Sequence, residues 1–218
     1  MAKLKTAILI SERGSNMRKL VAACNGPAFP AEVVLVLSNN PDAPGLEHAK
    51  EKGLAIHVID QSGFPKRAEF DVVLDSVLRD HKVNLVCLAG FMRILSEDLV
   101  NKWRNRIINI HPSLLPSFKG LNTHARVLQS GGSFSGCTVH FVRPEMDDGP
   151  VIVQAVVPVH NGDTSKKLAA RVLTAEHKAY PLALRLIAEG RVRLVGEKVK
   201  IDGALAPAGV VINPTEKS

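Results

Sequence analysis

Asn109 and His111 are the residues of this sequence whose types and spacing best suit chemistry at a carbonyl carbon. They end an apolar run, two positions apart, so on a strand their side chains point to the same face, about 7 Å apart. The amide can donate a hydrogen bond, and the imidazole can exchange a proton near neutral pH. The same pair is equally consistent with structural polar groups at the end of a strand.

A carboxylate is the third group that such chemistry requires, because a histidine that exchanges a proton is usually oriented by one. Glu145, Asp147 and Asp148 are the candidates in a later turn-forming loop. Asp148 precedes a glycine, a pair common in turns, which leaves Asp147 free to point inward. His124 and His140 are alternative imidazoles, and His140 shares a predicted strand face with residue 138.

The elements that position these residues follow from the hydrophobic pattern. Short apolar runs alternate with helical patterns up to residue 111, in units of about 25 residues. This alternation predicts an α/β fold with a doubly wound, mostly parallel sheet, and ligands bind at the carboxyl ends of such strands. The predicted strands are residues 6–10, 32–37, 56–59, 85–89 and 106–111.

The pattern changes after residue 120, where two consecutive β segments predict an antiparallel C-terminal part. The expected elements are a helix at 123–130, strands at 137–142 and 151–159, a helix at 164–189 and a hairpin at 192–195 and 199–201. Asp163 is the expected cap of the long helix, and Pro181 its expected break or kink. We expect one domain at 1–203, with a phosphate-binding half at 1–111, a half at 112–203 that completes the cleft, and a loosely held tail at 204–218.

Gly14, Ser15 and Asn16 lie between the first strand and a helical pattern. Free backbone N–H groups at a helix start bind anions, so a phosphate site is expected here. An ordinary capped turn would have the same residues. Neither G-x-G-x-x-G nor a Walker loop is present, so no nucleotide cofactor is indicated.

The segment 90–95, after the fourth strand, is an apolar loop. Exposed backbone beside Met92, Ile94 and Leu95 would form an apolar slot for a flat ring. The spacing alone is more typical of a hydrophobic staple that buries Leu95 against the following helix, which Ser96 would cap.

The composition limits the partners and the location of the protein. A net charge of +7 comes from scattered basic residues, and aromatic residues make up only 4% of the 218 residues. This pattern favours small anionic substrates over nucleic acid.

The three cysteines are far apart, and no histidines have metal-ligand spacing, so neither disulfides nor a metal is expected. No signal peptide or membrane span is apparent, which predicts a cytoplasmic protein.

Five motifs follow one another in a defined order between residue 6 and about residue 203. They are Gly14-Ser15-Asn16, the segment 89–95, the segment 109–116, the segment 145–150 and Glu176-His177. In this order and spacing they resemble the motifs of the phosphoribosylglycinamide formyltransferases of purine synthesis. The resemblance implies a Rossmann-like formyltransferase fold. It also implies that a formyl group moves from the cosubstrate 10-formyltetrahydrofolate to the amine of glycinamide ribonucleotide, in de novo purine (IMP) biosynthesis.

The resemblance also implies roles for individual residues. The implied catalytic residues are Asn109, His111 and Asp147. The implied ribonucleotide contacts are Gly14, Ser15, Asn16 and Glu176. The implied folate contacts are Arg67, Met92, Arg93, Ile94, Leu95, Asn109, Val142 and Asp147. No metal is implied, and the protein would act as a monomer or homodimer.

Two positions depart from the family pattern. Glu12 stands where relatives usually have glycine, which affects the expected shape of the phosphate loop. Asn122 occupies a position often held by histidine, so no catalytic role is assigned to it.

Two other folate enzymes and a non-enzyme are the alternatives. A methionyl-tRNA formyltransferase would need a further C-terminal domain. A formyltetrahydrofolate deformylase would need a further N-terminal domain. The length of the chain therefore favours neither of these enzymes. A non-catalytic module that binds phosphorylated ligands would need the Gly14 loop but not the amide, imidazole and carboxylate set.

Overall fold

The computed structural model describes residues 2–205 and 209–213. The predicted tail at 204–218 therefore lies partly outside the described residues. Among the described residues, no helix combines the length and the apolar character that crossing a membrane requires.

The centre of the molecule is a seven-stranded sheet with the order β3-β2-β1-β4-β5-β6-β7. Its strands are β1 (Leu4–Ile10), β2 (Ala31–Ser38), β3 (Ile56–Val58), β4 (Leu85–Leu88), β5 (Ile107–His111), β6 (Phe134–Phe141) and β7 (Val151–Pro158). The first five are parallel, whereas β6 and β7 run antiparallel to their neighbours. The predicted mostly parallel sheet with an antiparallel C-terminal part is confirmed, and each strand lies within a few residues of its predicted place.

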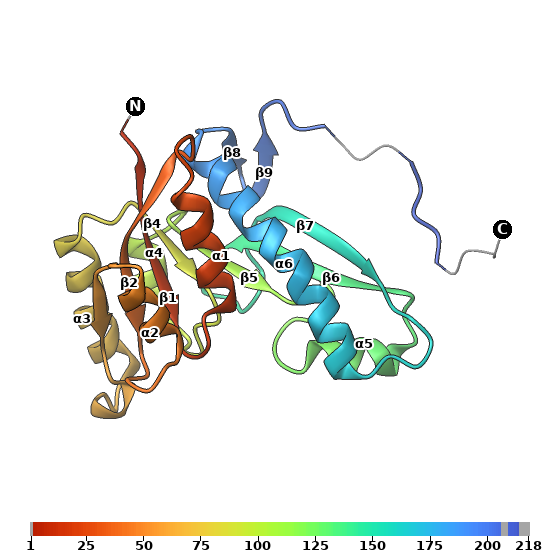
Figure 1. Ribbon diagram of the computed structural model, residues 1–218, viewed down its shortest axis with the longest axis horizontal. Coiled ribbons are helices and arrows are strands. Elements are labelled where there is room, and N and C mark those ends of the chain that lie inside the picture. The colour runs from red at the N-terminus through yellow and green to blue at the C-terminus, as the bar shows by residue number, and fades with distance from the viewer. Residues whose placement is uncertain (1, 206–208, 214–218) are drawn as a thin grey trace.

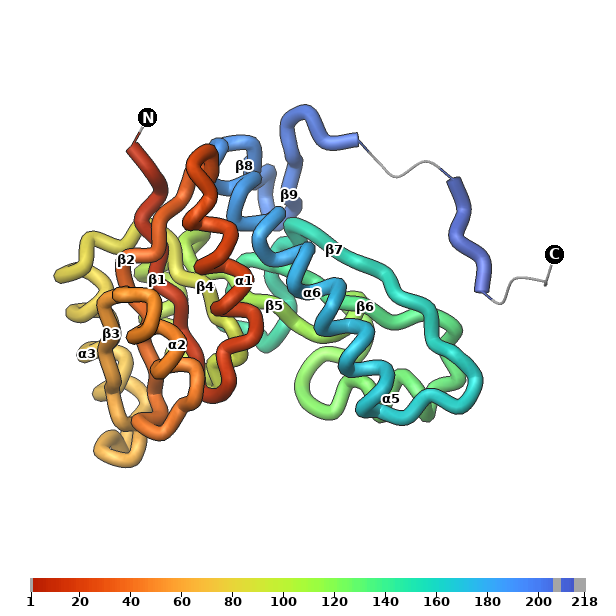
Figure 2. Tube along the Cα trace, viewed as in Figure 1, coloured from red at the N-terminus to blue at the C-terminus, as the bar shows by residue number. Residues whose placement is uncertain are grey.

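Helices cover both faces of this sheet, as a doubly wound fold requires. The helices are α1 (Ser15–Cys24), α2 (Gly45–Glu51), α3 (Arg67–Asp80), α4 (Glu97–Lys102), α5 (Thr123–Ser130) and α6 (Ser165–Ala188), with a 3₁₀ turn η1 at Gln61–Gly63. The strands β8 (Val192–Val195) and β9 (Lys198–Ile201) form the predicted hairpin. In Figures 1 and 2, α2, α1 and α6 follow one another across one side of the sheet.

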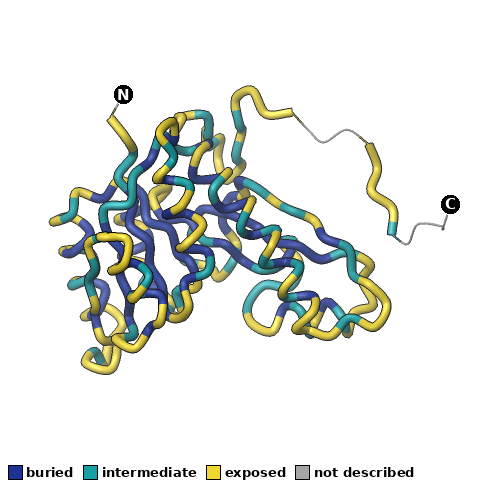
Figure 3. Tube along the Cα trace, in the orientation of Figure 1, coloured by how far each residue is buried: buried dark blue, intermediate teal, exposed yellow. Residues whose placement is uncertain are grey.

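Two apolar clusters show which helices share a face. Leu20 of α1 and Val172 of α6 belong to one cluster, together with Ile108 of β5. Phe70 of α3 and Trp103, next to α4, belong to the other. The buried segments in Figure 3 follow the strands, which lie between the two helix layers. Burial of these side chains, worth about 1.5–3 kcal/mol each, holds the layers together.

The start of α6 differs from the prediction. Thr164, and not Asp163, is the cap, because its hydroxyl accepts the N–H of Lys167 at 3.3 Å. The Asp163 carboxylate instead binds the guanidinium of Arg171, at 2.7 Å and 3.1 Å. Pro181 does not interrupt the helix, and Tyr180 and Ala183 on either side of it are buried in the apolar core.

The three cysteines are free and buried. Burial raises the pKa of the Cys24 thiol to about 11 and that of Cys137 to about 12. Protonated thiols are poor nucleophiles, so these residues act as small apolar core groups.

Tyr180 connects α6 to the two central strands that carry the site. Its ring is fully buried, and its hydroxyl lies 3.0 Å from the carbonyl of Leu88 in β4 and 3.2 Å from that of Ile108 in β5. The hydroxyl proton is therefore shared between two neighbouring strands. Its acceptor in β5, Ile108, directly precedes Asn109.

We predict that Tyr180→Phe lowers the free energy of unfolding by about 1–2 kcal/mol, because it removes a buried donor from two carbonyls without changing the packing of the ring. Urea unfolding followed by circular dichroism measures this loss. An unchanged midpoint with an unchanged slope would show that the hydroxyl does not stabilise the sheet.

Candidate functional site

Asn109 and His111 lie at the carboxyl end of β5, on the face opposite α6. Ile108 and Ile110, which alternate with them, belong to the apolar cluster under α1 and α6. Across the antiparallel ladder, Asn109 pairs with His140 and His111 pairs with residue 138. The register of β5 and β6 thus gathers polar side chains on one face of the sheet.

Asp147 completes the predicted set. Its carboxylate Oδ2 lies 3.3 Å from Nδ1 of His111 and accepts the backbone N–H of Gly120 at 2.9 Å. The residue has a left-handed backbone, with φ 52°. Asp148 is exposed and pairs with the ammonium of Lys119, so the two adjacent carboxylates take different directions.

The other ring nitrogen of His111 is also engaged. Nε2 lies 3.0 Å from the carbonyl oxygen of Phe118, which can only accept a hydrogen bond. Both neighbours of the ring are therefore oxygen acceptors. A ring that carries protons on both nitrogens would donate to each of them.

His140 is a member of the site that the sequence analysis left among the alternatives. Its Nδ1 donates to the carbonyl of Phe141 at 2.9 Å, so in the neutral ring Nε2 accepts from the amide Nδ2 of Asn109, 3.4 Å away. Burial lowers the pKa of His140, which favours this neutral form. Its Nε2 also lies 3.8 Å from Oδ1 of Asp147.

His124 lies at the start of α5 and is half-buried. Burial is the larger cause that lowers its pKa, and the proximity of His111 is the smaller. The structure shows no hydrogen bond for its Nδ1, which is shielded from solvent.

A second set of polar side chains fixes the loop that follows His111. The hydroxyl of Thr138 donates to the carbonyl of Ser113 at 2.7 Å and accepts the N–H of Leu115 at 3.0 Å. Gln154 donates to the carbonyl of Leu115 at 2.8 Å. Gln154 was not predicted from the sequence, because it faces Thr138 only once the register of β6 and β7 is known.

The residues predicted to bind a phosphate form the turn between β1 and α1. Gly14 has a left-handed backbone, with φ 64°, and precedes the first turn of α1, where backbone N–H groups lack helical partners. The Asn16 amide donates to Oε2 of Glu176 at 2.6 Å, so the structure brings together two residues that are 160 positions apart. This side chain is consequently turned toward α6, and its Oδ1 is buried without a partner.

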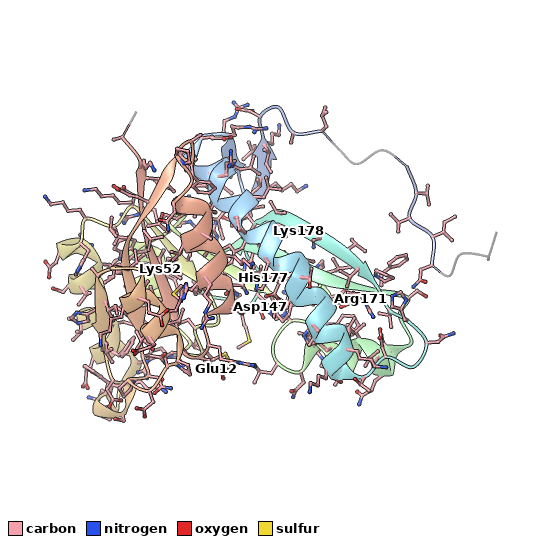
Figure 4. The ribbon with its side chains drawn as sticks, viewed as in Figure 1. Glu12, Lys52, Asp147, Arg171, His177 and Lys178 are labelled. Atoms are coloured by element: carbon pink, nitrogen blue, oxygen red, sulfur yellow. The ribbon has the colours of Figure 1, made fainter. Side chains whose placement is uncertain are left out.

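Glu12 does not need the backbone of a glycine. Its backbone φ is not positive, and its side chain is exposed. Its carbonyl accepts the N–H of Gly45 at 3.0 Å. The close approach is made by Gly45 instead, where an added Cβ would lie 2.9 Å from that carbonyl. In Figure 4 the labelled Glu12 lies near the amino end of α1.

The side chains that the resemblance assigns to folate binding differ in how far they are exposed. Met92 and Ile94 are exposed, whereas the side chain of Leu95 is buried beside α4, as the staple interpretation predicts. The guanidinium of Arg93 stacks on Phe70, 4.3 Å from the ring centroid. Arg67 is exposed at the start of α3, and Val142 is half-buried at the end of β6.

Ser11 connects this loop to the first strand. Its hydroxyl accepts the backbone N–H of Met92 at 2.7 Å and donates to the side chain of Asn39 at 2.6 Å. The loop after β4 is thus attached to the carboxyl ends of β1 and β2.

The two groups of polar residues lie on opposite sides of the sheet. Asn109, His111 and Asp147 are on the face away from α6, whereas Asn16 and Glu176 belong to α1 and α6. A ligand that contacts both groups would have to pass over the carboxyl ends of β1, β4 and β5, which is where open α/β sheets bind ligands. Within residues 2–205 and 209–213, no cluster of three or more metal-ligating side chains was found.

The fold and the site define a formyl transferase, and the chain belongs to the formyl transferase family, which it matches over residues 4–184. The phosphoribosylglycinamide formyltransferase of Escherichia coli (strain K12) is 42% identical over 204 residues, 94% of this chain and 96% of that protein. Glycinamide ribonucleotide transformylase 1 from Symbiobacterium toebii superposes with a TM-score of 0.89 at 43% identity, over 91% of this chain and 94% of that one.

A longer relative contains a similar segment. The trifunctional purine biosynthetic protein adenosine-3 of Gallus gallus is 51% identical over 199 residues, 91% of this chain but 20% of that protein. The chain thus spans about a fifth of the length of this trifunctional relative. These likenesses confirm the predicted resemblance to phosphoribosylglycinamide formyltransferases.

We predict that Glu176→Gln stabilises the protein at neutral pH but not at acidic pH. Burial raises the pKa of Glu176 above its ordinary value of 4.5, while the bond from Asn16 acts in the opposite direction. Below pH 4.5 the carboxyl group is protonated in both the folded and the unfolded states. Above pH 4.5 the Glu176 carboxyl group ionises in the unfolded chain before it ionises in the folded protein. The free energy of unfolding of the wild type therefore falls until the pH passes the raised pKa of the folded state.

Urea unfolding of both proteins at pH 4.5 and at pH 8 measures the difference. The glutamine variant should gain stability relative to wild type between these two values. A difference that is the same at both would show that the charge of Glu176 is not disfavoured in the folded protein.

Proposed function

We propose that this chain transfers the formyl group of 10-formyltetrahydrofolate to the amine of glycinamide ribonucleotide, giving formylglycinamide ribonucleotide and tetrahydrofolate in de novo purine (IMP) biosynthesis. The observation that supports this most is the contact of 3.3 Å between His111 and Asp147, beside Asn109, in a chain similar over its length to phosphoribosylglycinamide formyltransferases. The names of these relatives do not favour a deformylase, a methionyl-tRNA formyltransferase or a binding module.

Asn109 would stabilise the oxyanion. Attack by the amine on the formyl carbon creates a tetrahedral carbon with a negative oxygen. One N–H of the Asn109 amide faces His140, at 3.4 Å between the nitrogens, and the second is available to donate to that oxygen. One such donor is typically worth about 10²–10³ in rate.

Asp147 would carry the proton. One of its oxygens, Oδ2, is held by Gly120 and His111, which leaves Oδ1 to accept a proton from the attacking amine, directly or through a water molecule. The proton then passes to the folate nitrogen as the carbon–nitrogen bond to folate breaks. His111 would assist as a donor to the oxyanion or as a proton relay, and in both roles it must exchange its contact with Phe118 for one with the substrate.

The loops at the carboxyl edge would bind the substrates. Gly14, Ser15 and Asn16 would hold the phosphate through the N–H groups of the first turn of α1, and Glu176 would contact the glycinamide end. The folate would lie against Met92, Ile94 and Val142, with the backbone of Leu95 as a contact because its side chain is buried. Arg67 and Arg93 are cations that would flank it.

The remaining assignments accompany this function. We infer that residues 1–203 act as one catalytic domain and that the formyl folate is the only cosubstrate, with no metal. The protein would act in the cytoplasm as a monomer or homodimer.

A release assay tests the proposed function. The protein is incubated with 10-formyltetrahydrofolate, with and without glycinamide ribonucleotide, and the deformylated folate is followed. Release only with the ribonucleotide is expected. Release without it would indicate hydrolysis, and no release in either case would indicate a binding module.

We predict that Asp147→Asn lowers kcat by about 10²–10⁴ with little change in the KM of either substrate, because the amide cannot accept the proton. Asp148→Asn is the matched control, since it makes the same change one residue away on an exposed side chain. Steady-state kinetics of both variants measure the contrast. Equal kcat values for the two variants would remove Asp147 from the mechanism.

We predict that Glu12→Gln lowers the KM for the ribonucleotide by about two- to fivefold at low ionic strength, because it removes a negative charge two residues before Gly14. The value of kcat should not change. Glu32→Gln, at the amino end of β2, is the control of equal charge. An identical KM in all three proteins at low ionic strength would show that Glu12 does not affect the phosphate loop.

A further inference from the structure

A basic groove lies on the outer surface of the helix layer, apart from the catalytic residues. It has a volume of about 390 Å³ and is formed by α1, α2 and α6. Five of its lining side chains are basic: Arg18, Lys19, His48, Lys52 and His177. In Figure 4 the labelled Lys52 and His177 lie on either side of α1. Among the described residues that line the groove, none is an aspartate or glutamate.

The positive charge of the groove is poorly compensated. Among the described residues, only His48 of this set has a carboxylate within 4.0 Å, that of Glu51 at 3.7 Å, and Glu51 is itself exposed. Arginines elsewhere on the surface behave differently, since Arg79 and Arg171 each contact an aspartate. Three permanent cations that converge on one cavity without such partners attract anions.

His177 adds an unsatisfied group to the wall of the groove. Its Nε2 atom is shielded from solvent and has no hydrogen-bond partner. Burial lowers the pKa of His177, and the nearby charge of Lys19 lowers it further. The lowered pKa favours the uncharged ring, so the charge that the groove offers to a ligand comes mainly from Arg18, Lys19 and Lys52.

We propose that this groove binds a compact polyanion, a small molecule with two or more phosphate groups. Arg18, Lys19 and Lys52 together carry more charge than a single phosphate would neutralise. The volume lies within the range of small-molecule sites, and Val21 and Ala22 give the groove an apolar part beside its cations. This site goes beyond the proposed function, because the formyl transfer uses residues at the carboxyl edge of the sheet.

Isothermal titration with inorganic pyrophosphate, with orthophosphate as the comparison, tests the proposal. Pyrophosphate should bind wild type, and the double variant Lys19→Ala, Lys52→Ala should bind it at least about tenfold more weakly. The control is Lys50→Ala, Lys178→Ala, which removes the same charge from exposed lysines of α2 and α6 that do not line the groove. Its affinity should stay within about twofold of wild type, and transferase activity checks that both variants are folded.

A competition experiment separates this site from the phosphate loop, because Ser15 lies at one end of the groove. Saturation with glycinamide ribonucleotide should leave the affinity for pyrophosphate within about threefold. Complete displacement would mean that pyrophosphate occupies the Gly14 loop and would overturn the proposal. Absence of binding at millimolar pyrophosphate, orthophosphate binding as tight as pyrophosphate binding, or equal weakening in both double variants, would also overturn it.

Discussion

The contact between the Asp147 carboxylate and the His111 ring is the interaction on which the rest of the site depends. It joins the end of β5 to a loop 36 residues farther along the chain, and it exists only because that loop turns back over the sheet. The turn requires the left-handed backbone of Asp147 and the absence of a side chain at Gly149, where a Cβ would lie 1.7 Å from the carbonyl oxygen of Phe141. The loop geometry thus serves to place one carboxylate.

The sheet supplies the remaining geometry. Its parallel strands bring the loops after β1, β4 and β5 to one edge, so that the proposed anion site, an apolar loop and the proposed catalytic residues lie along the same border. The change to antiparallel pairing at β6 then sets His140 directly beside Asn109. A parallel strand at that position would need a crossover connection and would not return the chain to β5 so directly.

Local pattern predicted much of this arrangement. The alternation of apolar runs gives the doubly wound sheet, two-residue spacing puts Asn109 and His111 on one face, and the Asp-Gly turn separates Asp147 from Asp148. The contacts that sequence reasoning missed depend on register or on distant partners. Asn16 turns to Glu176 on a helix 160 positions away, and Gln154 faces Thr138 only through the pairing of β6 and β7. Asp163 was wrongly expected to cap α6, because its carboxylate instead binds the guanidinium of Arg171, nearly two helical turns into α6.

A double-mutant cycle on kcat tests the central claim most directly. Transferase activity is measured for wild type, His111→Ala, Asp147→Ala and the double variant, with both substrates saturating. If the two side chains act as one unit, the double variant loses about as much activity as the more damaging single variant. If the two losses multiply, the residues act independently and the account of this site is wrong.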